Sequence, residues 1–307
     1  MNSIKIFCPA TIANISCGFD VLGVALDTIG DEMVIRKVDK KGIRITKLEG
    51  QYLPIETLKN VAGVAGLALM AKSDYTGGFE IEIYKRIKAG SGIGSSAASS
   101  TGAVWAMNEL LNKPFSTLEL VKFAMEGERL ASGVAHADNV APALFGGFTL
   151  VRSYDPLDIV PIHTPTELYA TVIHPQIEVK TSDSRKILKT NITLADGIKQ
   201  WGNLGGLIAG LFTEDYALIG RSLTDHIVEP IRSILIPGFD AVKSEALRAG
   251  ALGCGISGSG PSIFAFSQGE KIAHKVGQSM KEVYKNIGVD YDVHISKINR
   301  QGIKILN

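Results

Sequence analysis

A run of glycine and serine at residues 90–96 is the part of the sequence whose residue types and spacing most clearly suggest chemistry. The run reads Gly-Ser-Gly-Ile-Gly-Ser-Ser, and it lies between an alternating stretch at residues 79–84 and an alanine-rich stretch. Glycine lets the backbone approach a ligand closely, and the N–H groups of such a loop and of the following helix can surround an anion. The unit therefore predicts a phosphate site, where Ser95 or Ser96 could also reach a nucleotide-bound Mg²⁺.

Two familiar glycine loops do not fit this run. A Walker A loop ends in Gly-Lys-Ser or Gly-Lys-Thr, and neither tripeptide occurs here. A dinucleotide-binding fingerprint would place glycine where Ser95 stands and would need an acidic strand end further on. The pattern alone leaves one alternative open, a plain turn between a strand and a helix of small residues.

A second glycine cluster occupies residues 253–262, just before an apolar stretch. It holds four glycines and three serines in ten residues. A tight connection from a helix to a strand would need fewer of them. Backbone donors that face a ligand would explain the excess.

The elements that must position these loops mix strands and helices without regular alternation. Alternating stretches predict strands, helical spacing predicts helices, and the pair Ser116 and Glu119 predicts a capping box. The expected strands are residues 4–7, 42–48, 79–84, 148–152, 168–174, 262–266 and 292–298; the expected helices are residues 60–72, the stretch after the first glycine run, and residues 116–131, 194–213, 239–249 and 271–286. This order favours an α+β fold over a doubly wound parallel sheet.

Length and composition add a domain organisation and exclude several classes of protein. A chain of 307 residues corresponds to two domains or one large one, and the prolines at residues 156, 161 and 165 suggest a division into residues 1–160 and 161–307. The 32 basic and 31 acidic residues nearly cancel, which argues against a nucleic acid or membrane-surface partner. Three cysteines without CxxC spacing, no long apolar run and a poor signal peptide predict a cytoplasmic protein.

Three motifs in the same order resemble those of the small-molecule kinases of the GHMP superfamily (galactokinase, homoserine kinase, mevalonate kinase, phosphomevalonate kinase). Residues 9–14 and 18–23 are similar to the N-terminal motif, residues 88–98 to the nucleotide loop, and residues 255–261 to the C-terminal glycine motif. The loop departs from the superfamily pattern at Ile93, where leucine is usual. We expect little effect, because this position should contribute its backbone and an apolar contact.

Within the superfamily, the chain resembles the homoserine kinase family. The run at residues 136–147, Arg185 within residues 181–185 and Arg232 within residues 229–232 carry this likeness. The resemblance implies ATP- and Mg²⁺-dependent phosphorylation of the side-chain hydroxyl of L-homoserine, a step towards threonine. It also implies an N-terminal domain like ribosomal protein S5 domain 2, a ferredoxin-like C-terminal α/β sandwich and a homodimer. Another GHMP kinase, acting on shikimate or mevalonate, and a non-catalytic ligand-binding relative are the alternatives.

The resemblance also assigns residues to the nucleotide and the metal. Mg²⁺ would bind Ser96 and Glu128; alternatively, Glu128 lies on a solvated helix face beside Glu126 and Arg129. Asn60 matches an adenine contact, although its position also suits a plain helix N-cap. The residues expected to bind nucleotide are Asn60, Lys88, Ala89, Gly90, Ser91, Gly92, Ile93, Gly94, Ser95, Ser96, Ala97 and Ala98.

The substrate residues follow from the zwitterionic form of homoserine. Arg185 and Arg232 can hold the α-carboxylate as bidentate forks, or they are ordinary surface charges. Asp20 and Asn14 can accept from the α-ammonium group, but both residue types also form turns beside Gly18. Gly260 completes the substrate residues on the C-terminal motif.

The segment at residues 136–139 lines the acceptor pocket in related kinases. His136 and Asn139 are therefore expected to bind substrate, and Asp138 and Asn139 are the candidate catalytic residues. A zinc site would need further ligands at compatible spacing, which the sequence lacks, and a lone histidine among apolar residues is often a core residue. Asp138 matches an aspartate proposed as base in mevalonate kinase relatives. Phosphoryl transfer has a loose transition state, so alignment and charge neutralisation can carry most of the acceleration without it.

Overall fold

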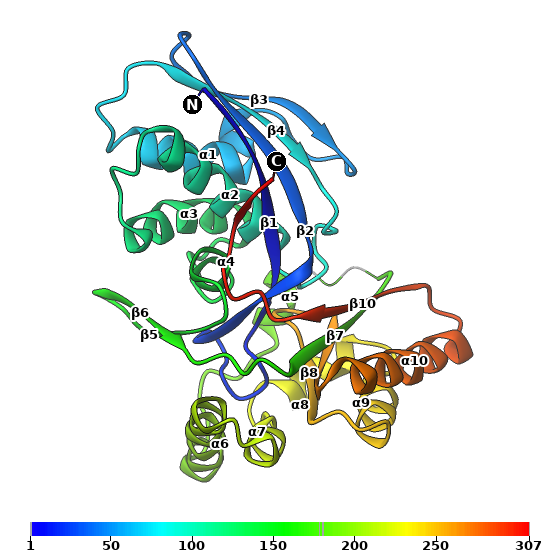
Figure 1. Cartoon of the computed structure of the whole chain (residues 1–307). Helices are drawn as coiled ribbons and strands as arrows, with labels where there is room; N and C mark the ends of the chain where they lie inside the picture. Colours follow the sequence, from blue (N-terminus) through cyan, green and yellow to red (C-terminus); the bar gives the residue numbers. More distant parts are fainter. Residues whose placement is uncertain (1, 178, 180, 307) are drawn as a thin grey trace.

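The computed structural model describes residues 2–177, 179 and 181–306, which form two sheets with helices packed against them (Figure 1). In the first sheet, β2 is the long central strand that pairs with β1, β4 and β5. The order β11-β1-β2-β4-β3 is extended by β5, which pairs with β2 and β6. Its strands are β1 (Ser3–Ala13), β2 (Leu22–Val38), β3 (Gly42–Glu49), β4 (Gly78–Tyr84), β5 (Phe148–Tyr154), β6 (Leu157–Ile162) and β11 (Lys304–Ile305).

Helices of the first half gather on one side of the first sheet (Figure 1). α2 lies against β1 and β2 and packs on α1 and α3. Small residues line its buried face, so the helix can approach the strands closely: a Cβ on Gly102 would lie 2.4 Å from Cys8 Sγ. These elements are η1 (Thr57–Lys59), α1 (Val61–Met70), α2 (Ser95–Leu110), α3 (Thr117–Ser132) and α4 (Val140–Phe145).

The second sheet is antiparallel, in the order β10-β7-β9-β8, and α9 and α10 pack against it. α6 and α7 form a separate pair at the other side of this half (Figure 1). The elements are β7 (Leu168–Pro175), α5 (Thr181–Lys186), α6 (Leu194–Thr213), α7 (Tyr216–Ser222), α8 (Glu229–Arg232), η2 (Ser233–Leu235), α9 (Phe239–Arg248), β8 (Gly253–Ile256), β9 (Ile263–Gln268), α10 (Glu270–Ile287) and β10 (Tyr291–Lys297).

The architecture confirms the predicted α+β class. β3 and β4 pair in parallel, whereas the other strand pairs are antiparallel. Alternation identified β4 correctly because Phe79, Ile81 and Ile83 are buried on one face. The capping box at the start of α3 is also present, with Ser116 and Glu119 bonded reciprocally.

Two features of the first sheet bear on the predicted domain division. β6 runs across residues 160 and 161, and the C-terminal strand β11 returns to pair with β1 (Figure 1). The division at residue 160 therefore stays a prediction. The C-terminal segment after residue 303 contributes a strand to the first sheet.

Glycine content misled the sequence interpretation at one element. Residues 253–256 form the buried strand β8, which is not among the strands expected from the sequence. Glycine is needed at positions 253 and 255 of this strand because neighbouring side chains leave no room for a Cβ. A Cβ on Gly253 would lie 2.4 Å from Leu223 Cβ. Only the second half of the cluster is therefore available to a ligand.

All three cysteines, Cys8, Cys17 and Cys254, are buried free thiols. Among the described residues, no helix has the length and apolar character needed to cross a bilayer.

Candidate active site

A cavity of about 560 Å³ lies where the first glycine loop meets the residues 14–20, α5 and α8. We call it the central cavity. Most of the residues singled out from the sequence line it, together with several that were not. The lining residues are Asn14, Asp20, Leu53, Val61, Lys85, Ala89, Gly90, Gly92, Gly94, Ser95, Ser96, Ser99, Glu128, Ala131, Ser132, His136, Asp138, Asn139, Val179, Arg185, Arg232, Gly258 and Ser259.

The first glycine loop presents its backbone and the start of α2 to the central cavity. Gly94 is the N-cap of α2 and has φ +72°, and a Cβ there would lie 2.0 Å from Thr11 Oγ1. Glycine is therefore required by both conformation and space. The free N–H groups of the first helical turn add a partial positive charge at this point, as an anion site needs.

Part of the predicted loop does not line the cavity. Lys88 donates to Gln176 Oε1, and the side chains of Ser91 and Ile93 are buried. Ala97 and Ala98 are buried in α2. These five residues support the loop, and their assignment as direct nucleotide contacts stays a prediction.

The second glycine cluster packs against the first. Ser257 Oγ donates to Gly92 O at 2.8 Å, and a Cβ on Gly92 would lie 2.6 Å from Gly260 O. Gly258 and Ser259 line the cavity, but Gly260 does not. Gly260 thus belongs to the contact between the two loops, and its role in substrate binding remains a prediction.

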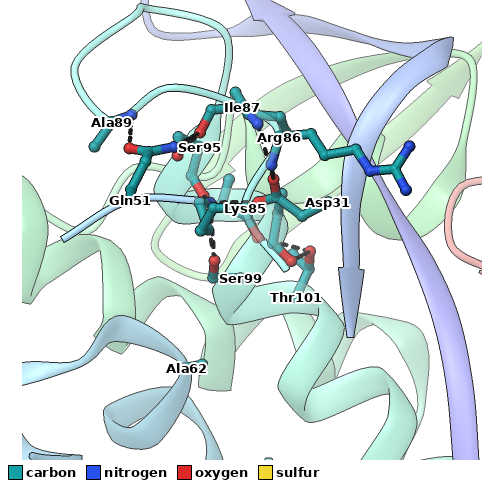
Figure 2. A network of polar contacts seen from close by, with 12 residues as sticks. Asp31, Gln51, Ala62, Lys85, Arg86, Ile87, Ala89, Ser95, Ser99 and Thr101 are labelled. Atoms are coloured by element: carbon teal, nitrogen blue, oxygen red, sulfur yellow. Dashed lines mark hydrogen bonds and ion pairs between the residues drawn. The ribbon is translucent and has the colours of Figure 1, made fainter. Parts of the chain in front are cut away.

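A buried lysine that sequence reasoning missed holds the first loop in place (Figure 2). Lys85 forms an ion pair with Asp31, and its Nζ also donates to Ser95 O at 2.8 Å and Ser99 Oγ at 3.1 Å. Asp31 Oδ1 accepts from the backbone N–H groups of Arg86 (2.8 Å) and Ile87 (2.9 Å). The pair therefore joins β2, the entry of the loop and the first turns of α2.

In the sequence, Lys85 is one of three basic residues at positions 85, 86 and 88, and nothing distinguishes it from the other two. Its partner Asp31 lies in the long strand β2, 54 residues away, and no local pattern relates the two. An acidic residue within an apolar strand was the available signal, because a buried charge requires a partner.

Two amides beside the loop have structural partners. Gln51 accepts from Ala89 N and donates to Ile87 O, both at 2.7 Å, so it clamps the loop from outside (Figure 2). Asn60 caps α1 by accepting from Ala62 N and donates to Pro54 O. Asn60 is thus the plain N-cap considered from the sequence, and it does not line the cavity; an adenine contact remains a prediction.

Glu128 and Ser96 meet at the cavity as expected from the resemblance. Ser96 Oγ donates to Glu128 Oε2 at 3.0 Å. Glu128 is buried, so the alternative of a solvated helix face is wrong, and its Oε1 has no hydrogen-bond partner in the described part of the chain. Burial raises the pKa of this carboxyl to about 7. A buried carboxylate oxygen without a partner fits a position beside a cation.

No group of three or more histidine, cysteine, aspartate or glutamate side chains among the described residues could hold a metal by itself. Mg²⁺ usually binds to one or two protein ligands together with substrate phosphates and water. The pair of Ser96 and Glu128 therefore fits Mg²⁺ carried by a nucleotide, and it does not fit an independent zinc site.

The other end of the cavity gathers charged side chains from distant segments. Asp20 accepts from Arg185 through two hydrogen bonds of 3.0 and 2.9 Å, a bidentate ion pair. The same carboxylate lies 3.9 Å from His136 Nδ1. Asn14 orients this loop, because its Oδ1 accepts from Asp20 N and its Nδ2 donates to Gly258 O.

Arg232 differs from Arg185 because no carboxylate pairs with it in the described part of the chain. The residue is 3% exposed, and its guanidinium donates to Ser184 O and Gly258 O, both at 3.1 Å. Burial, followed by the charge of Arg185, lowers the pKa of Arg232 to about 10. A buried cation bonded only to neutral carbonyls retains its attraction for an anion.

The segment at residues 136–139 places three polar residues, His136, Asp138 and Asn139, at the cavity. Asp138 is buried, and desolvation, aided by the charge of Asp20, raises its pKa to about 7. Asn139 is held by Thr11 Oγ1, which donates to Asn139 Oδ1 at 2.7 Å. Burial lowers the pKa of His136, whose Nε2 is buried without a hydrogen-bond partner in the described chain.

Tyr154, which sequence reasoning missed, holds this segment in place by accepting from Ala137 N and donating to Asp20 O.

Comparison with known proteins places this arrangement in one family. Residues 57–147 match the family described as "GHMP kinases N terminal domain", and residues 207–286 match "GHMP kinases C terminal". The homoserine kinase of Chlorobium phaeovibrioides is 46% identical over 320 residues, with all of both chains covered. The homoserine kinase of Xylella fastidiosa is 36% identical over 304 residues, which cover 98% of this chain and 94% of the relative.

Solved structures agree with the sequence relatives. The crystal structure of homoserine kinase from Cytophaga hutchinsonii has a TM-score of 0.96 and 55% identity, and covers 100% of this chain and 98% of that one. The predicted GHMP kinase fold is thereby confirmed, as is the resemblance drawn from the three motifs. The chain belongs to the homoserine kinase family of the GHMP kinases.

Proposed function

We propose that this chain is an ATP-dependent kinase that phosphorylates the side-chain hydroxyl of L-homoserine. The observation that carries the proposal is Arg232, a buried guanidinium that faces the central cavity and pairs with no carboxylate in the described chain. Such a cation suits an acceptor that carries a carboxylate. The full-length similarity to relatives named homoserine kinase supports the same substrate.

The nucleotide end would bind ATP mainly through backbone groups. The N–H groups of the glycine loop and of the first turn of α2 suit the phosphates, and Lys85, paired with Asp31, fixes the start of α2 through its bond to Ser95 O. Leu53, Val61 and Ala131 provide apolar lining of the kind that a purine ring requires.

Ser96 and Glu128 would hold the magnesium ion that accompanies ATP. When bound, Mg²⁺ neutralises charge on the phosphate oxygens. Glu128 contributes a buried carboxylate whose Oε1 has no other partner in the described chain, and Ser96 holds the second oxygen.

The acceptor end would recognise the two charges of the amino acid. Asp20 and Arg185 neutralise each other through their bidentate pair. The α-ammonium group can replace Arg185 as the partner of Asp20, while the α-carboxylate binds Arg232 and the released Arg185. A zwitterion thus exchanges one internal ion pair for two external ones, and an alcohol with only one charge cannot.

Asp138 and Asn139 would contact the reacting hydroxyl. Asp138, with a pKa near 7, can accept its proton, whereas alignment by Asn139 and Arg232 needs no base. Replacing Asp138 with asparagine distinguishes proton acceptance by Asp138 from alignment of the hydroxyl. A loss of kcat by about 100-fold or more assigns proton acceptance to Asp138, and a loss below about tenfold assigns the acceleration to alignment.

The test of the proposed function is release of ADP from Mg-ATP with L-homoserine, L-serine, shikimate, mevalonate or no acceptor. We expect turnover that is strong and selective for L-homoserine. Selective use of shikimate or mevalonate would keep the nucleotide assignments and overturn the acceptor roles. Nucleotide binding without turnover on any acceptor would favour the non-catalytic alternative.

We further propose the homodimer that the resemblance implies, formed through α6. Leu194, Ile198, Trp201 and Phe212 are 57–70% exposed and share one face of this helix by their spacing. Changing Trp201 to glutamate should halve the mass measured by light scattering. The matched control is Leu247→Glu, on the exposed face of α9. A monomeric wild-type chain at micromolar concentration would contradict the proposal.

A further inference from the structure

Phe19 lies behind the two arginines of the acceptor end without lining the central cavity. The centroid of its ring is 5.4 Å from Arg185 Cζ and 5.0 Å from Arg232 Cζ, and both guanidinium groups lie over the ring. We propose that Phe19 is a positioning residue for carboxylate recognition: its ring holds the two guanidinium groups in the orientation that binds the α-carboxylate. This inference rests on the proposed function and extends it to a residue outside the cavity.

The need for such a residue follows from the charges. Arg185 and Arg232 approach a common point from α5 and α8, and the charge of Arg185 contributes to the lowered pKa of Arg232. Asp20 compensates Arg185 through its bidentate ion pair, but no carboxylate forms an ion pair with Arg232 in the described chain. The negative face of an aromatic ring attracts a guanidinium group without using its hydrogen-bond donors. Phe19 can therefore stabilise both cations and leave donors for the substrate.

The donors of Arg232 support this division of roles. Its Nε donates to Ser184 O and its Nη1 to Gly258 O, so two of its three nitrogens are fixed by the protein. Nη2 donates no hydrogen bond within the described chain. The ring contact and the two carbonyls together fix the guanidinium plane, and both N–H bonds of Nη2 and the second N–H bond of Nη1 are left for a carboxylate.

The loop that carries Phe19 has a conformation enforced by its surroundings. Asn14, Ile15, Ser16 and Asp20 all have positive φ, between 44° and 70°, which side-chain-bearing residues rarely adopt. Backbone bonds from Gly18 N to Asn14 O, and from Val21 N and Leu22 N to Gly18 O, close the turn. Strain of this kind persists where the exact placement of side chains matters. Here it places Phe19 and Asp20 side by side, one under the guanidinium groups and one against Arg185.

The variant Phe19→Leu keeps an apolar side chain of similar size and removes the ring face. We expect its KM for L-homoserine to rise about tenfold, as for the loss of a partly desolvated cation–π contact, while the KM for ATP stays within about twofold. Phe19→Tyr keeps the ring and should retain the wild-type KM for L-homoserine within about twofold. The matched control is Phe115→Leu, which removes a half-buried ring that packs edge-on against Phe123.

A double-mutant cycle separates positioning from loop packing. In an Arg232→Ala background, the effect of Phe19→Leu on the KM for L-homoserine should fall well below tenfold, because one of the two cations is gone. A purely structural role would predict the same factor in both backgrounds and a rise in the KM for ATP. Equal loss in Phe19→Tyr and Phe19→Leu would also overturn the inference.

Calorimetric titration of L-homoserine into protein saturated with a non-hydrolysable ATP analogue tests the role of Phe19 separately from the proposed function. We expect the wild type to bind and Phe19→Leu to bind about tenfold more weakly. Binding by the wild type that Phe19→Leu leaves unchanged would overturn the role of Phe19 alone. Failure of the wild type to bind L-homoserine would overturn the proposed function and the role of Phe19 with it.

Discussion

The two ends of the central cavity are built in different ways. The nucleotide end comes largely from one continuous segment, from Lys85 to Ser99, and it offers backbone N–H groups beside a helix start. The acceptor end brings together charged side chains from the N-terminal loop (residues 14–20), the segment at residues 136–139, α5 and α8. A continuous segment leaves a local pattern in the sequence, whereas an assembly of separate side chains leaves none.

The difference also affects how each end responds to mutation. Backbone donors survive most side-chain changes, so the nucleotide end depends on glycine conformations and on a few supports such as Lys85 and Asp31. At the acceptor end, recognition depends on individual charged side chains, which are the buried Arg232 and the partly exposed pair of Asp20 and Arg185. We therefore expect substitutions at the acceptor end to alter one kinetic constant strongly and the other little.

The largest expected effect is that of Arg232→Ala. Loss of a buried, hydrogen-bonded partner for the α-carboxylate should raise the KM for L-homoserine by at least about 30-fold and leave the KM for ATP within about twofold. Steady-state kinetics with each substrate varied would measure both. Arg248→Ala removes an exposed arginine of α9 and should change neither constant. A comparable rise in both constants would contradict the separation of the two ends.

An intermediate effect is expected at the nucleotide end from Glu128→Gln. The amide keeps the shape but lacks the charge, so the Mg²⁺ concentration for half-maximal turnover should rise about tenfold while the KM for L-homoserine changes little. Glu126→Gln, on the same helix but paired with Arg129 at the surface, serves as the control. A metal titration that matches the wild type would remove Glu128 from the metal site.

A smaller effect, on stability, is expected from Asp138→Asn. The folded state raises the pKa of Asp138 from 3.8 to about 7, so it binds this proton more tightly than the unfolded chain does. This contribution to stability is complete below pH about 4 and is lost as the pH rises to about 7. The neutral asparagine avoids that loss. The free energy of unfolding of the variant, measured relative to the wild type, should therefore be about 1 to 4 kcal/mol greater at pH 8 than at pH 4.

Urea denaturation of the ligand-free protein with EDTA at the two pH values would measure this difference. Asp158→Asn, at an exposed carboxylate paired with Arg152, should show a difference within about 0.5 kcal/mol. A stability gain of Asp138→Asn that is the same at both pH values would show that the carboxyl is not forced to ionise in a desolvated site.

The sequence predicted local features of the molecule better than long-range ones. Alternation and capping located β4 and α3 because these signals lie within a few residues of each other. The strand β8 was missed because its glycines are typical of loops, and their tolerance depends on Leu223 and other neighbours from distant segments. The return of β11 to the first sheet likewise depends on pairing with β1, almost 300 residues away.

The candidate site follows the same rule. The glycine loop was identified from its own residues, but the burial of Lys85 and its pairing with Asp31 were not, because the partners are 54 residues apart. At the acceptor end, the arginines and Asp20 were proposed through the resemblance, yet their mutual pairing was not anticipated. The bidentate contact of Asp20 with Arg185 exists only once α5 packs beside the N-terminal loop.

The central claim is that the acceptor end recognises both charges of a zwitterion, independently of the nucleotide end. The most direct test is kcat/KM of the wild-type protein for L-homoserine, for 4-hydroxybutanoate, which lacks the ammonium group, and for 3-amino-1-propanol, which lacks the carboxylate. We expect each analogue to be used at least about 100-fold less efficiently, with the KM for ATP unchanged. Use of either analogue within a few-fold of L-homoserine would contradict the claim.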